Sequence, residues 1–276
     1  MVGEAWTDTD VIKNYYGTGS DEFNMCFDFG LPYNICDAIG AGSSGPDVSK
    51  YSGYADYVKG LSFPGKLGAF SVNHDKVVSR AATLYGGDRK KCIDSAALNI
   101  LSYGVPFVYY GEEVGMTGTA NEDINLRANF PWSAVTSQSS NTQSILSWYK
   151  YLIAARKGNK ALNEGGITFK SNGGTSVLSY VADWGSQYVL VVVNLNSSAQ
   201  TFNVTGLPVV SGTPQNIIGA NSASPFSGSS ITINGIPANG IRVILLQNGS
   251  GTAYTDASGS DVPYYSKTGV FASDLQ

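Results

Sequence analysis

The first part of the chain alternates short apolar runs with longer segments of helical periodicity. The apolar runs end at Glu4 or cover residues 23–29, 67–72 and 105–110, and the helical segments cover residues 7–15, 47–59, 80–102 and 141–157. The runs are apolar throughout instead of at every second position, which is typical of parallel strands covered on both faces. Alternating strands and helices predict a parallel sheet with crossover helices, and therefore an α/β domain over residues 1–164.

The pattern changes near Gly165. From there, Thr-, Val- and Ile-rich runs recur between Gly, Asn and Ser turns, with no helical segment between them. The predicted strands are residues 177–181, 188–194, 201–204, 231–233 and 241–246. This spacing predicts an all-β domain, an antiparallel β-sandwich over residues 165–248. Residues 249–276 are rich in Ser, Gly and Asp, and we expect this tail to be poorly ordered.

Polar side chains follow two of the apolar runs in the first part. Glu4 closes the first run, and the run 67–72 stops at Asn73, His74 and Asp75; His74 is the only histidine of the chain. In parallel α/β folds the carboxyl ends of the strands carry the chemistry, so this pattern predicts a site there. The alternative is structural, with Asp75 capping a following helix.

Composition narrows the class of partner. Charged residues make up 14% of the chain, the net charge is −4 and the pI is near 5.0. A net negative charge does not favour binding to the phosphates of a nucleic acid. No apolar run approaches the length of a membrane span. A neutral partner such as a sugar fits better, since sugars bind aromatic faces and hydrogen-bonding groups.

The cysteines and the glycosylation sequons give information on the cellular location of the protein. Cys26, Cys36 and Cys92 form no metal pattern. They fit either three buried thiols or a Cys26–Cys36 bridge with Cys92 free. The low charge and the glycosylation sequons at Asn196, Asn203 and Asn248 favour an extracellular location. The residues after Met1 show no signal-peptide pattern.

Four stretches, in order, carry a resemblance to a known family. They are Val2-Gly-Glu-Ala-Trp6, Asn73-His-Asp75, Gly104-Val-Pro-Phe-Val-Tyr-Tyr-Gly-Glu-Glu-Val-Gly-Met116 and Arg127-Ala-Asn-Phe-Pro-Trp132. Together they resemble the α-amylase family of glycoside hydrolases, and the resemblance extends to about Gln247. It implies strands five to eight of a (β/α)8 TIM barrel, that is the second half of the barrel, followed by the family's C-terminal β-sandwich.

The resemblance also implies roles for individual residues. Glu4 would be the general acid/base, and Asp75 would stabilise the transition state by holding sugar hydroxyls. A leaving glycosidic oxygen needs a proton, and the developing oxocarbenium ion needs negative charge nearby, so two carboxylates suit these tasks. The remaining residues assigned to substrate binding are Asn73, His74, Trp6, Tyr109, Tyr110 and Arg127. The arginine that the family often places three residues after the aspartate is Val78 here, and Arg80 lies two residues further on.

The nucleophile is the main departure from the family pattern. A retaining glycosidase needs a second carboxylate on the opposite face of the sugar. In this family it is an aspartate ending strand four, ahead of the residue that matches Glu4. We therefore expect doubtful turnover by this chain alone. Asp28, Glu112 and Glu113 lie near the same predicted rim, but Glu112 and Glu113 are expected to shape a cleft loop.

The same comparison sets the expected partners. The family's usual calcium-ligand region has no counterpart here, so no cofactor or metal is expected in this chain. The expected substrate is an α-1,4-glucan such as starch or a maltooligosaccharide, with no nucleic acid and no membrane as partner. An open half-barrel leaves uncovered an inner face lined by residues such as Val72, Phe107 and Tyr109, which predicts self-association or a missing N-terminal half. The alternative function is a non-catalytic carbohydrate-binding or remnant protein derived from an amylase.

Overall fold

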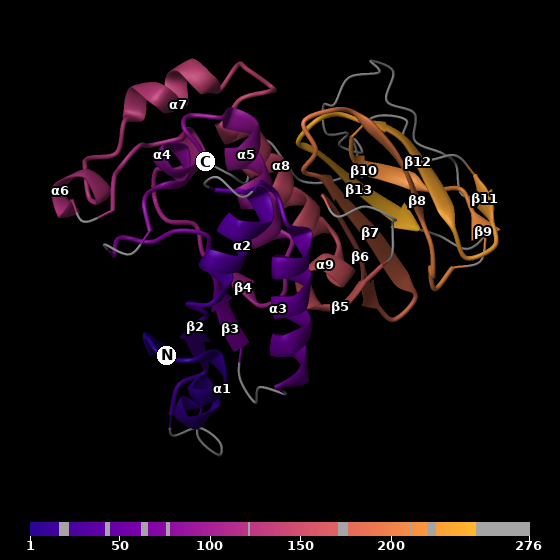
Figure 1. Ribbon diagram of the computed structural model, residues 1–276, viewed down its shortest axis with the longest axis horizontal. Helices are drawn as coiled ribbons and strands as arrows, with labels where there is room; N and C mark the ends of the chain where they lie inside the picture. The colour runs from indigo at the N-terminus through magenta and orange to yellow at the C-terminus, as the bar shows by residue number, and fades with distance from the viewer. Residues whose placement is uncertain are drawn as a thin grey trace. The chain divides into compact units, whose positions relative to one another are not determined.

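The structure is a computed structural model. It describes residues 1–16, 22–41, 45–61, 66–75, 78–120, 122–170, 176–209, 211–219 and 225–246. These residues form two compact units (Figure 1). The first contains Met1–Ser140 and Ser144–Leu146, and the second contains the described residues of Asn141–Gln143 and Ser147–Gln276.

A four-stranded parallel sheet forms the centre of the first unit. Its strands are β1 (Val2–Gly3), β2 (Met25–Phe27), β3 (Lys66–Ala69) and β4 (Val105–Pro106), and they lie side by side in chain order. Neighbouring strands run parallel, with Gly3 beside Cys26, Cys26 beside Leu67 and Gly68 beside Val105. The prediction of a parallel sheet is confirmed. The strands are shorter than the apolar runs, because the chain leaves the sheet within each run.

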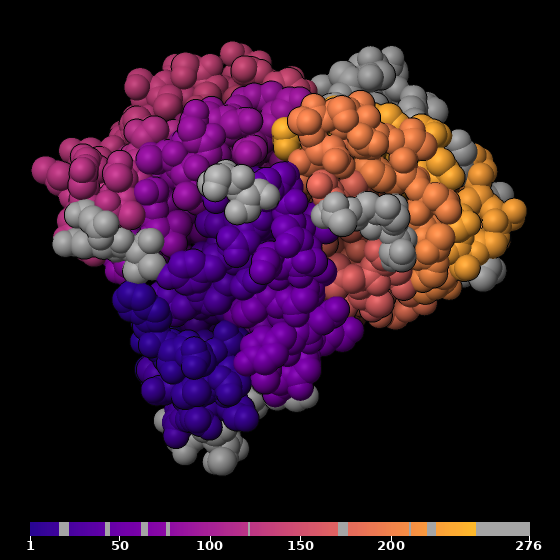
Figure 2. Space-filling model, in the orientation of Figure 1, coloured from indigo at the N-terminus to yellow at the C-terminus, as the bar shows by residue number. Residues whose placement is uncertain are grey.

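Helices connect these strands. They are α1 (Thr9–Ile12), the 3-10 turn η1 (Lys13–Tyr15), α2 (Leu31–Ile39), α3 (Val48–Gly60), α4 (Ala81–Leu84) and α5 (Arg89–Ile100). After β4 come the 3-10 turn η2 (Glu112–Val114), α6 (Asp123–Leu126) and α7 (Trp132–Gln138). Figure 2 shows the indigo N-terminal segment adjoining α3 on the surface of this unit, and the Thr9 hydroxyl shares a hydrogen bond of 2.8 Å with that of Tyr54.

One helical prediction was wrong, and helix α2 was missed. The single helix expected over residues 80–102 is interrupted, because Gly86 and Gly87 have φ of 63° and 79°, which a right-handed helix does not accept. Helix α2 was missed; it carries Pro32 in its first turn and follows Gly30. Proline is tolerated in the first turn, however, and Gly40 ends the helix in the left-handed region.

The buried residues explain how the helices cover the sheet. One apolar cluster joins Ile12 of α1 and Val58 of α3 to Cys26 and Leu67 of the central strands. The three cysteines are free thiols, with Cys26 and Cys92 buried, so the alternative of a Cys26–Cys36 bridge is wrong. Cys36 lies in α2 instead of at the end of a turn.

The second unit contains helices α8 (Ile145–Gly158, from Ser147 onward) and α9 (Lys160–Glu164) and antiparallel strands. Strands β10 (Gln215–Ile218), β13 (Gly240–Leu246), β7 (Gln187–Asn194), β6 (Val177–Trp184) and β5 (Gly166–Phe169) form one sheet in that order. Two further pairs are β12 (Ile231–Ile236) with β8 (Gln200–Val204), and β11 (Phe226–Ser227) with β9 (Ser211–Gly212). One apolar cluster includes Leu190 of β7, Phe202 of β8 and Ile233 of β12, so the large sheet and the β8–β12 pair share a core. The prediction of antiparallel strands is confirmed, and in the described part of residues 166–246 no helix lies between them.

The boundaries of the compact units differ from the residue at which composition changes. Strands replace helices near Gly165, whereas the units divide around residues 141–147, because α9 contacts β6 and β7. The predicted tail over residues 249–276 lies outside the described residues. Within the part of the chain that the structure describes, no helix is long and apolar enough to cross a bilayer.

Candidate active site

Both predicted catalytic carboxylates line one small cavity in the first unit. Its volume is about 150 Å³. Polar groups come from Glu4, Asn73, His74, Asp75 and Tyr109, and the apolar wall consists of Phe27, Phe29, Phe70, Val72, Phe107 and Val108. Glu4 follows β1 and the triplet follows β3, with β2 between them. Two strand spacings separate those strands by about 10 Å, so side chains from each can approach one small ligand.

The Asn73–Asp75 triplet is ordered by its own hydrogen bonds. Asn73 Nδ2 donates to Asp75 Oδ2 at 3.2 Å, and the Asp75 backbone N–H donates to Asn73 Oδ1 at 3.0 Å. His74 Nε2 lies 3.4 Å from Asp75 Oδ1, and the two side chains are 43% and 25% exposed. Asn73 therefore holds the carboxylate in place while one side of the histidine ring faces solvent.

The apolar wall follows from strand periodicity. Phe27 and Phe29 flank Asp28, and side chains two residues apart point to the same face of a strand. The Phe27 ring meets Phe107 edge-on at 4.8 Å, and Phe29 meets Phe70 at 5.4 Å. Sequence reasoning identified Val72, Phe107 and Tyr109 as part of this face but missed Phe27, Phe29 and Phe70. The alternation of Phe27 and Phe29 was the signal that could have located two of them.

Tyr109 is held by a buried arginine behind the cavity. The Tyr109 hydroxyl donates to Leu126 O at 3.0 Å, and its ring centroid lies 6.1 Å from that of His74. The guanidinium carbon of Arg80 lies 4.4 Å from the Tyr109 centroid and 4.9 Å from the Tyr110 centroid. Arg80 is fully buried and donates to Tyr110 O and Leu126 O, each at 2.7 Å. It thus connects the segment after β3 to the long segment after β4.

Glu112 is the charged partner of this arginine. Arg80 Nη1 donates to Glu112 Oε1 at 3.1 Å, and the Ala81 backbone N–H donates to Oε2 at 3.2 Å. Burial raises the pKa of Glu112 from 4.5 to about 7, while Arg80 and the Ala81 N–H act to lower it. Glu112 therefore links the loop after β4 to Arg80 and Ala81. Its expected role in shaping the substrate cleft stays a prediction.

Asp28 occupies a different kind of position. It has no exposed surface, and its carboxylate accepts hydrogen bonds from Tyr54, from Tyr103 at 2.9 Å, and from the backbone N–H groups of Gly30 and Leu31. Burial raises the pKa of Asp28 despite these bonds. Asp28 is not among the residues lining the cavity, so it is not placed to attack a sugar there.

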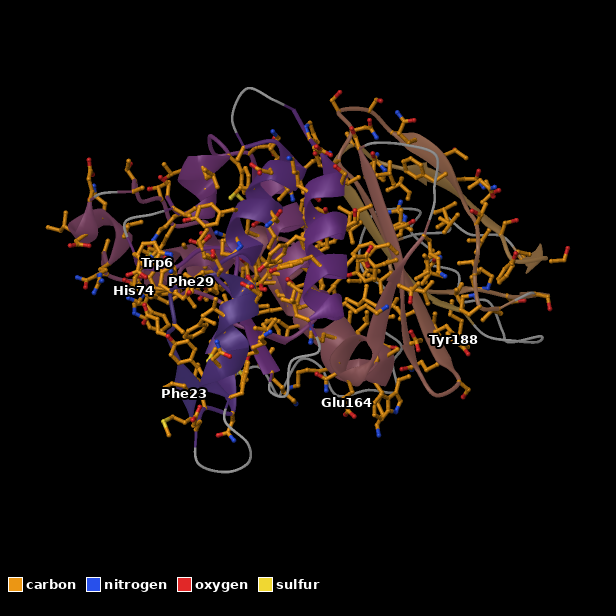
Figure 3. The ribbon with its side chains drawn as sticks, turned by 60° about the horizontal axis from the view of Figure 1, so that its bottom comes forward. Trp6, Phe23, Phe29, His74, Glu164 and Tyr188 are labelled. Carbon is orange, nitrogen blue, oxygen red and sulfur yellow. The ribbon has the colours of Figure 1, made fainter. Side chains whose placement is uncertain are left out.

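Three of the predicted substrate-binding residues, Trp6, Tyr110 and Arg127, are not among the residues that line this cavity. Trp6 is 63% exposed and stacks on Phe29, with ring centroids 5.9 Å apart. The Tyr110 hydroxyl donates to Ala128 O at 2.8 Å, and Arg127 Nε lies 4.0 Å from Asp123 Oδ1 with both side chains more than half exposed. Figure 3 shows Trp6, Phe29 and His74 close together, away from Phe23, which precedes β2. Trp6 therefore borders the cavity, whereas Arg127 faces its own helix.

Among the described residues, no group of three or more His, Cys, Asp or Glu side chains is placed to hold a metal ion. The lining of the cavity offers two carboxylates, an imidazole and an aromatic wall.

Comparisons with known proteins agree with this arrangement. Residues 1–131 match the family model described as the α-amylase catalytic domain. Alpha-amylase 3 of Dictyoglomus thermophilum is 27% identical over 227 residues, which cover 74% of this chain and 44% of that protein. Alpha-amylase SusG of Bacteroides thetaiotaomicron is 29% identical over 189 residues, covering 61% of this chain and 26% of that protein. The chain thus spans half or less of the length of these relatives.

Solved structures agree on the fold. The α-amylase from H. orenii superposes with a TM-score of 0.73 at 22% identity, covering 89% of this chain and 53% of that one. The α-amylase from Geobacillus thermoleovorans gives the same TM-score at 20% identity, covering 90% of this chain and 53% of that one. The family match over residues 1–131, which contain the parallel sheet and its cavity, shows that this part of the chain is similar to the catalytic domain of the α-amylase family of glycoside hydrolases.

Proposed function

We propose that this chain carries the general acid/base and the transition-state-stabilising part of a retaining α-amylase-type site that acts on α-1,4-glucans such as starch and maltooligosaccharides. The observation that carries the proposal is that Glu4 and Asp75 line one cavity together with Asn73, His74 and Tyr109. The matching relatives are named as α-amylases and cyclomaltodextrinases, which supports a carbohydrate substrate. An extracellular location, expected from composition, stays a prediction.

The proposed mechanism assigns one task to each polar group. Glu4 donates a proton to the glycosidic oxygen as the bond breaks and a nucleophilic carboxylate, which the described lining does not supply, bonds to the anomeric carbon. Glu4 later takes a proton from the water that displaces this carboxylate. Asp75, held by Asn73, accepts hydrogen bonds from sugar hydroxyls and stabilises the positive charge that develops on the ring. His74 adds a hydrogen bond to the same ring, and the aromatic wall excludes water from it.

The proposal extends to the architecture. The four parallel strands correspond to the second half of a (β/α)8 barrel, and the antiparallel sheets of the second unit correspond to a β-sandwich. Support comes from the order of strands and helices and from the TM-score of 0.73 with a solved α-amylase.

A second candidate function is carbohydrate binding without turnover. It is favoured by one observation: among the described residues lining the cavity, Glu4 and Asp75 are the only carboxylates. A retaining reaction needs a nucleophilic carboxylate about 5 Å from the acid, in addition to the stabilising aspartate. With these residues alone, glucan binding is expected to exceed turnover.

The test compares sugar release with sugar binding. Reducing sugar released from soluble starch is measured for the chain, for Glu4→Gln and for Glu22→Gln, an exposed glutamate outside the cavity. The enzyme proposal predicts release that is lost in Glu4→Gln and kept in Glu22→Gln. Maltoheptaose binding without release in any of the three supports the second candidate. Absence of both binding and release would contradict both candidates.

A further inference from the structure

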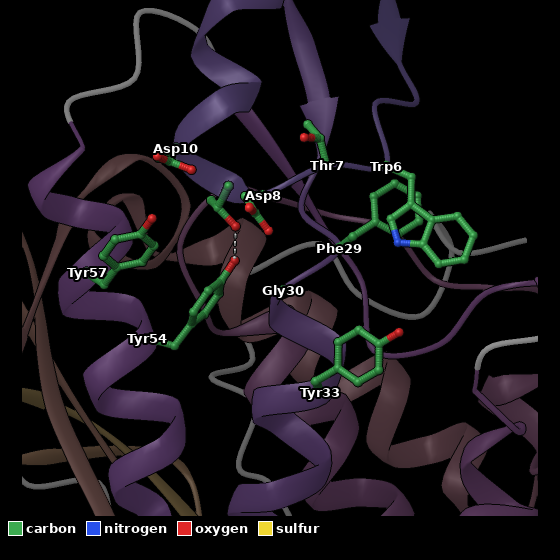
Figure 4. Close-up of a pocket in the computed structure, with 10 residues that line it drawn as sticks. Trp6, Thr7, Asp8, Asp10, Phe29, Gly30, Tyr33, Tyr54 and Tyr57 are labelled. Carbon is green, nitrogen blue, oxygen red and sulfur yellow. Dashed lines mark hydrogen bonds between the residues drawn. The ribbon is translucent and has the colours of Figure 1, made fainter.

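Another, larger cavity lies beside the segment that follows β1. Its volume is about 630 Å³ (Figure 4), a size that suits a small organic molecule. We call it the acidic aromatic cavity. It is lined by Trp6, Thr7, Asp8, Thr9 and Asp10 after β1, by Phe29, Gly30 and Tyr33 at the start of α2, and by Tyr54 and Tyr57 of α3.

Exposed aromatic rings from three separate segments line this cavity. Trp6, Tyr33 and Tyr57 are 63%, 45% and 47% exposed. Tyr54, behind them, is fixed by its hydroxyl, which shares a hydrogen bond of 2.8 Å with that of Thr9 and donates to the buried Asp28. A wall that is already held in place loses little conformational entropy when a ligand binds.

Two carboxylates at this cavity have no cationic partner. Asp8 and Asp10 are exposed, and within the described residues neither forms an ion pair. Asp8 precedes α1, but its side chain makes no capping hydrogen bond. Among the described residues that line the cavity there is also no lysine, arginine or histidine. The lining therefore carries negative charge that no lining residue balances.

The carboxylates lie close to one of the exposed rings. Burial raises the pKa of Tyr57, and Asp10 and Asp8 raise it further, because negative charge near the hydroxyl disfavours its ionisation. Figure 4 shows Asp10 next to Tyr57. A ligand bound at Tyr57 therefore meets an aromatic face and negative charge together.

These features narrow the class of ligand. The carboxylates disfavour anions, and the N–H groups of Gly30 and Leu31 at the start of α2 donate to Asp28 instead of facing a ligand. For a metal ion, no group of three or more acidic, His or Cys ligands exists among the described residues. An uncharged ligand would use the rings but not the charge. An organic cation uses both, since it is attracted by carboxylates and by the faces of aromatic rings.

We propose that the acidic aromatic cavity binds a small organic cation of the alkylated ammonium class. The alkyl groups contact the exposed rings of Tyr33 and Tyr57, and the positive charge lies near Asp8 and Asp10. The site goes beyond the proposed function, because it requires neither a glucan nor turnover at Glu4.

The test compares a cation with its uncharged copy. Calorimetry on the full chain measures binding of choline and of its carbon isostere, in which a tert-butyl group replaces the trimethylammonium group. Choline is expected to bind at least about tenfold more tightly. Tyr57→Ala should raise the Kd of choline about two- to fivefold, as the loss of one exposed cation–π contact does. Asp8→Asn combined with Asp10→Asn should raise it about three- to tenfold.

Control variants locate the site. Tyr15→Ala removes a ring that is 41% exposed, and Asp56→Asn removes an exposed charge of α3; neither residue lines the cavity. Asp75→Asn removes a carboxylate of the smaller cavity. All three are expected to leave the Kd of choline unchanged, and circular dichroism melting checks that the variants fold alike.

Several results would overturn the inference. One is equal binding of choline and its isostere, since the charge would then not be recognised. Another is a choline Kd that changes in Asp75→Asn but not in the variant that lacks the charges of Asp8 and Asp10, which would place the cation in the smaller cavity. The third is absence of choline binding, and maltoheptaose binding that Tyr57→Ala weakens would then identify the occupant as an uncharged sugar.

Discussion

At the scale of single residues, the sequence located the carboxylates but not their support. Glu4 and Asp75 were predictable because each follows an apolar run, and parallel strands end at one rim. Arg80 was noticed only for lying two residues beyond the family's usual position. Its partners are Tyr110 O, Glu112 and Leu126 O, which lie 30 to 46 residues away in the sequence. Local sequence patterns cannot predict contacts over such separations.

Loss of the Arg80 guanidinium should destabilise the first unit. In Arg80→Met, two backbone carbonyls lose their donor and Glu112 is left buried without a cation. We expect a loss of about 3–5 kcal/mol in the free energy of unfolding, typical of breaking a buried ion pair. Denaturant unfolding measures it, with Arg127→Met as control, because that side chain is 55% exposed. A loss as small as that of the control would mean that Arg80 does not hold the loop.

The same variant should change the dependence of stability on pH. The folded pKa of Glu112, about 7, lies above its ordinary value of 4.5, so its contribution is full below 4.5 and lost as the pH rises through 7. Arg80 opposes this rise, and its removal raises the pKa further. We therefore expect the stability gap between the parent and Arg80→Met to widen from pH 5 to pH 8. A gap that narrows over this interval would contradict the assignment.

At the scale of secondary-structure elements, the sequence predicted the alternation of strands and helices and the parallel direction of the strands. It did not predict the interruption within a helix. Continuous apolar runs separated by helices sufficed to predict four parallel strands. The break at Gly86–Gly87 was missed because the apolar periodicity continues past it. The cavity lined by the segment after β1, the start of α2 and part of α3 was also missed, because it forms only when three elements are in place at once.

The junction of β2 and α2 depends on one carboxylate. Asp28 accepts four hydrogen bonds, two from the first backbone N–H groups of α2 and two from tyrosines of other segments. Asp28→Ala leaves these donors buried without an acceptor, so we expect a loss of about 3 kcal/mol or more in the free energy of unfolding. Asp47→Ala removes the solvent-facing cap of α3 and should cost only about 1 kcal/mol. Equal losses in thermal or denaturant unfolding would show that the Asp28 network is not a structural anchor.

At the scale of the whole molecule, the parallel sheet of the first unit is open. Within the described residues, β1 pairs only with β2 and β4 pairs only with β3, and the face between them is lined by aromatic rings. Open edges and exposed apolar surface favour pairing with another chain. The self-association expected from the sequence stays a prediction, and the open edges of this sheet are the feature on which it rests.

Self-association through this open sheet can be tested by sedimentation. Both edge strands contain only two residues, so backbone pairing at the edges is limited and the apolar face must supply most of the attraction. We expect a concentration-dependent shift from monomer to dimer for the chain without added partner. Val2→Lys, on the β1 edge and 44% exposed, should weaken the dimer, because a charge at an edge opposes pairing. Val11→Lys, 36% exposed on α1, should not. A monomer at every concentration would mean that the cavity wall already shields this face from water, and the open sheet would then need no second chain.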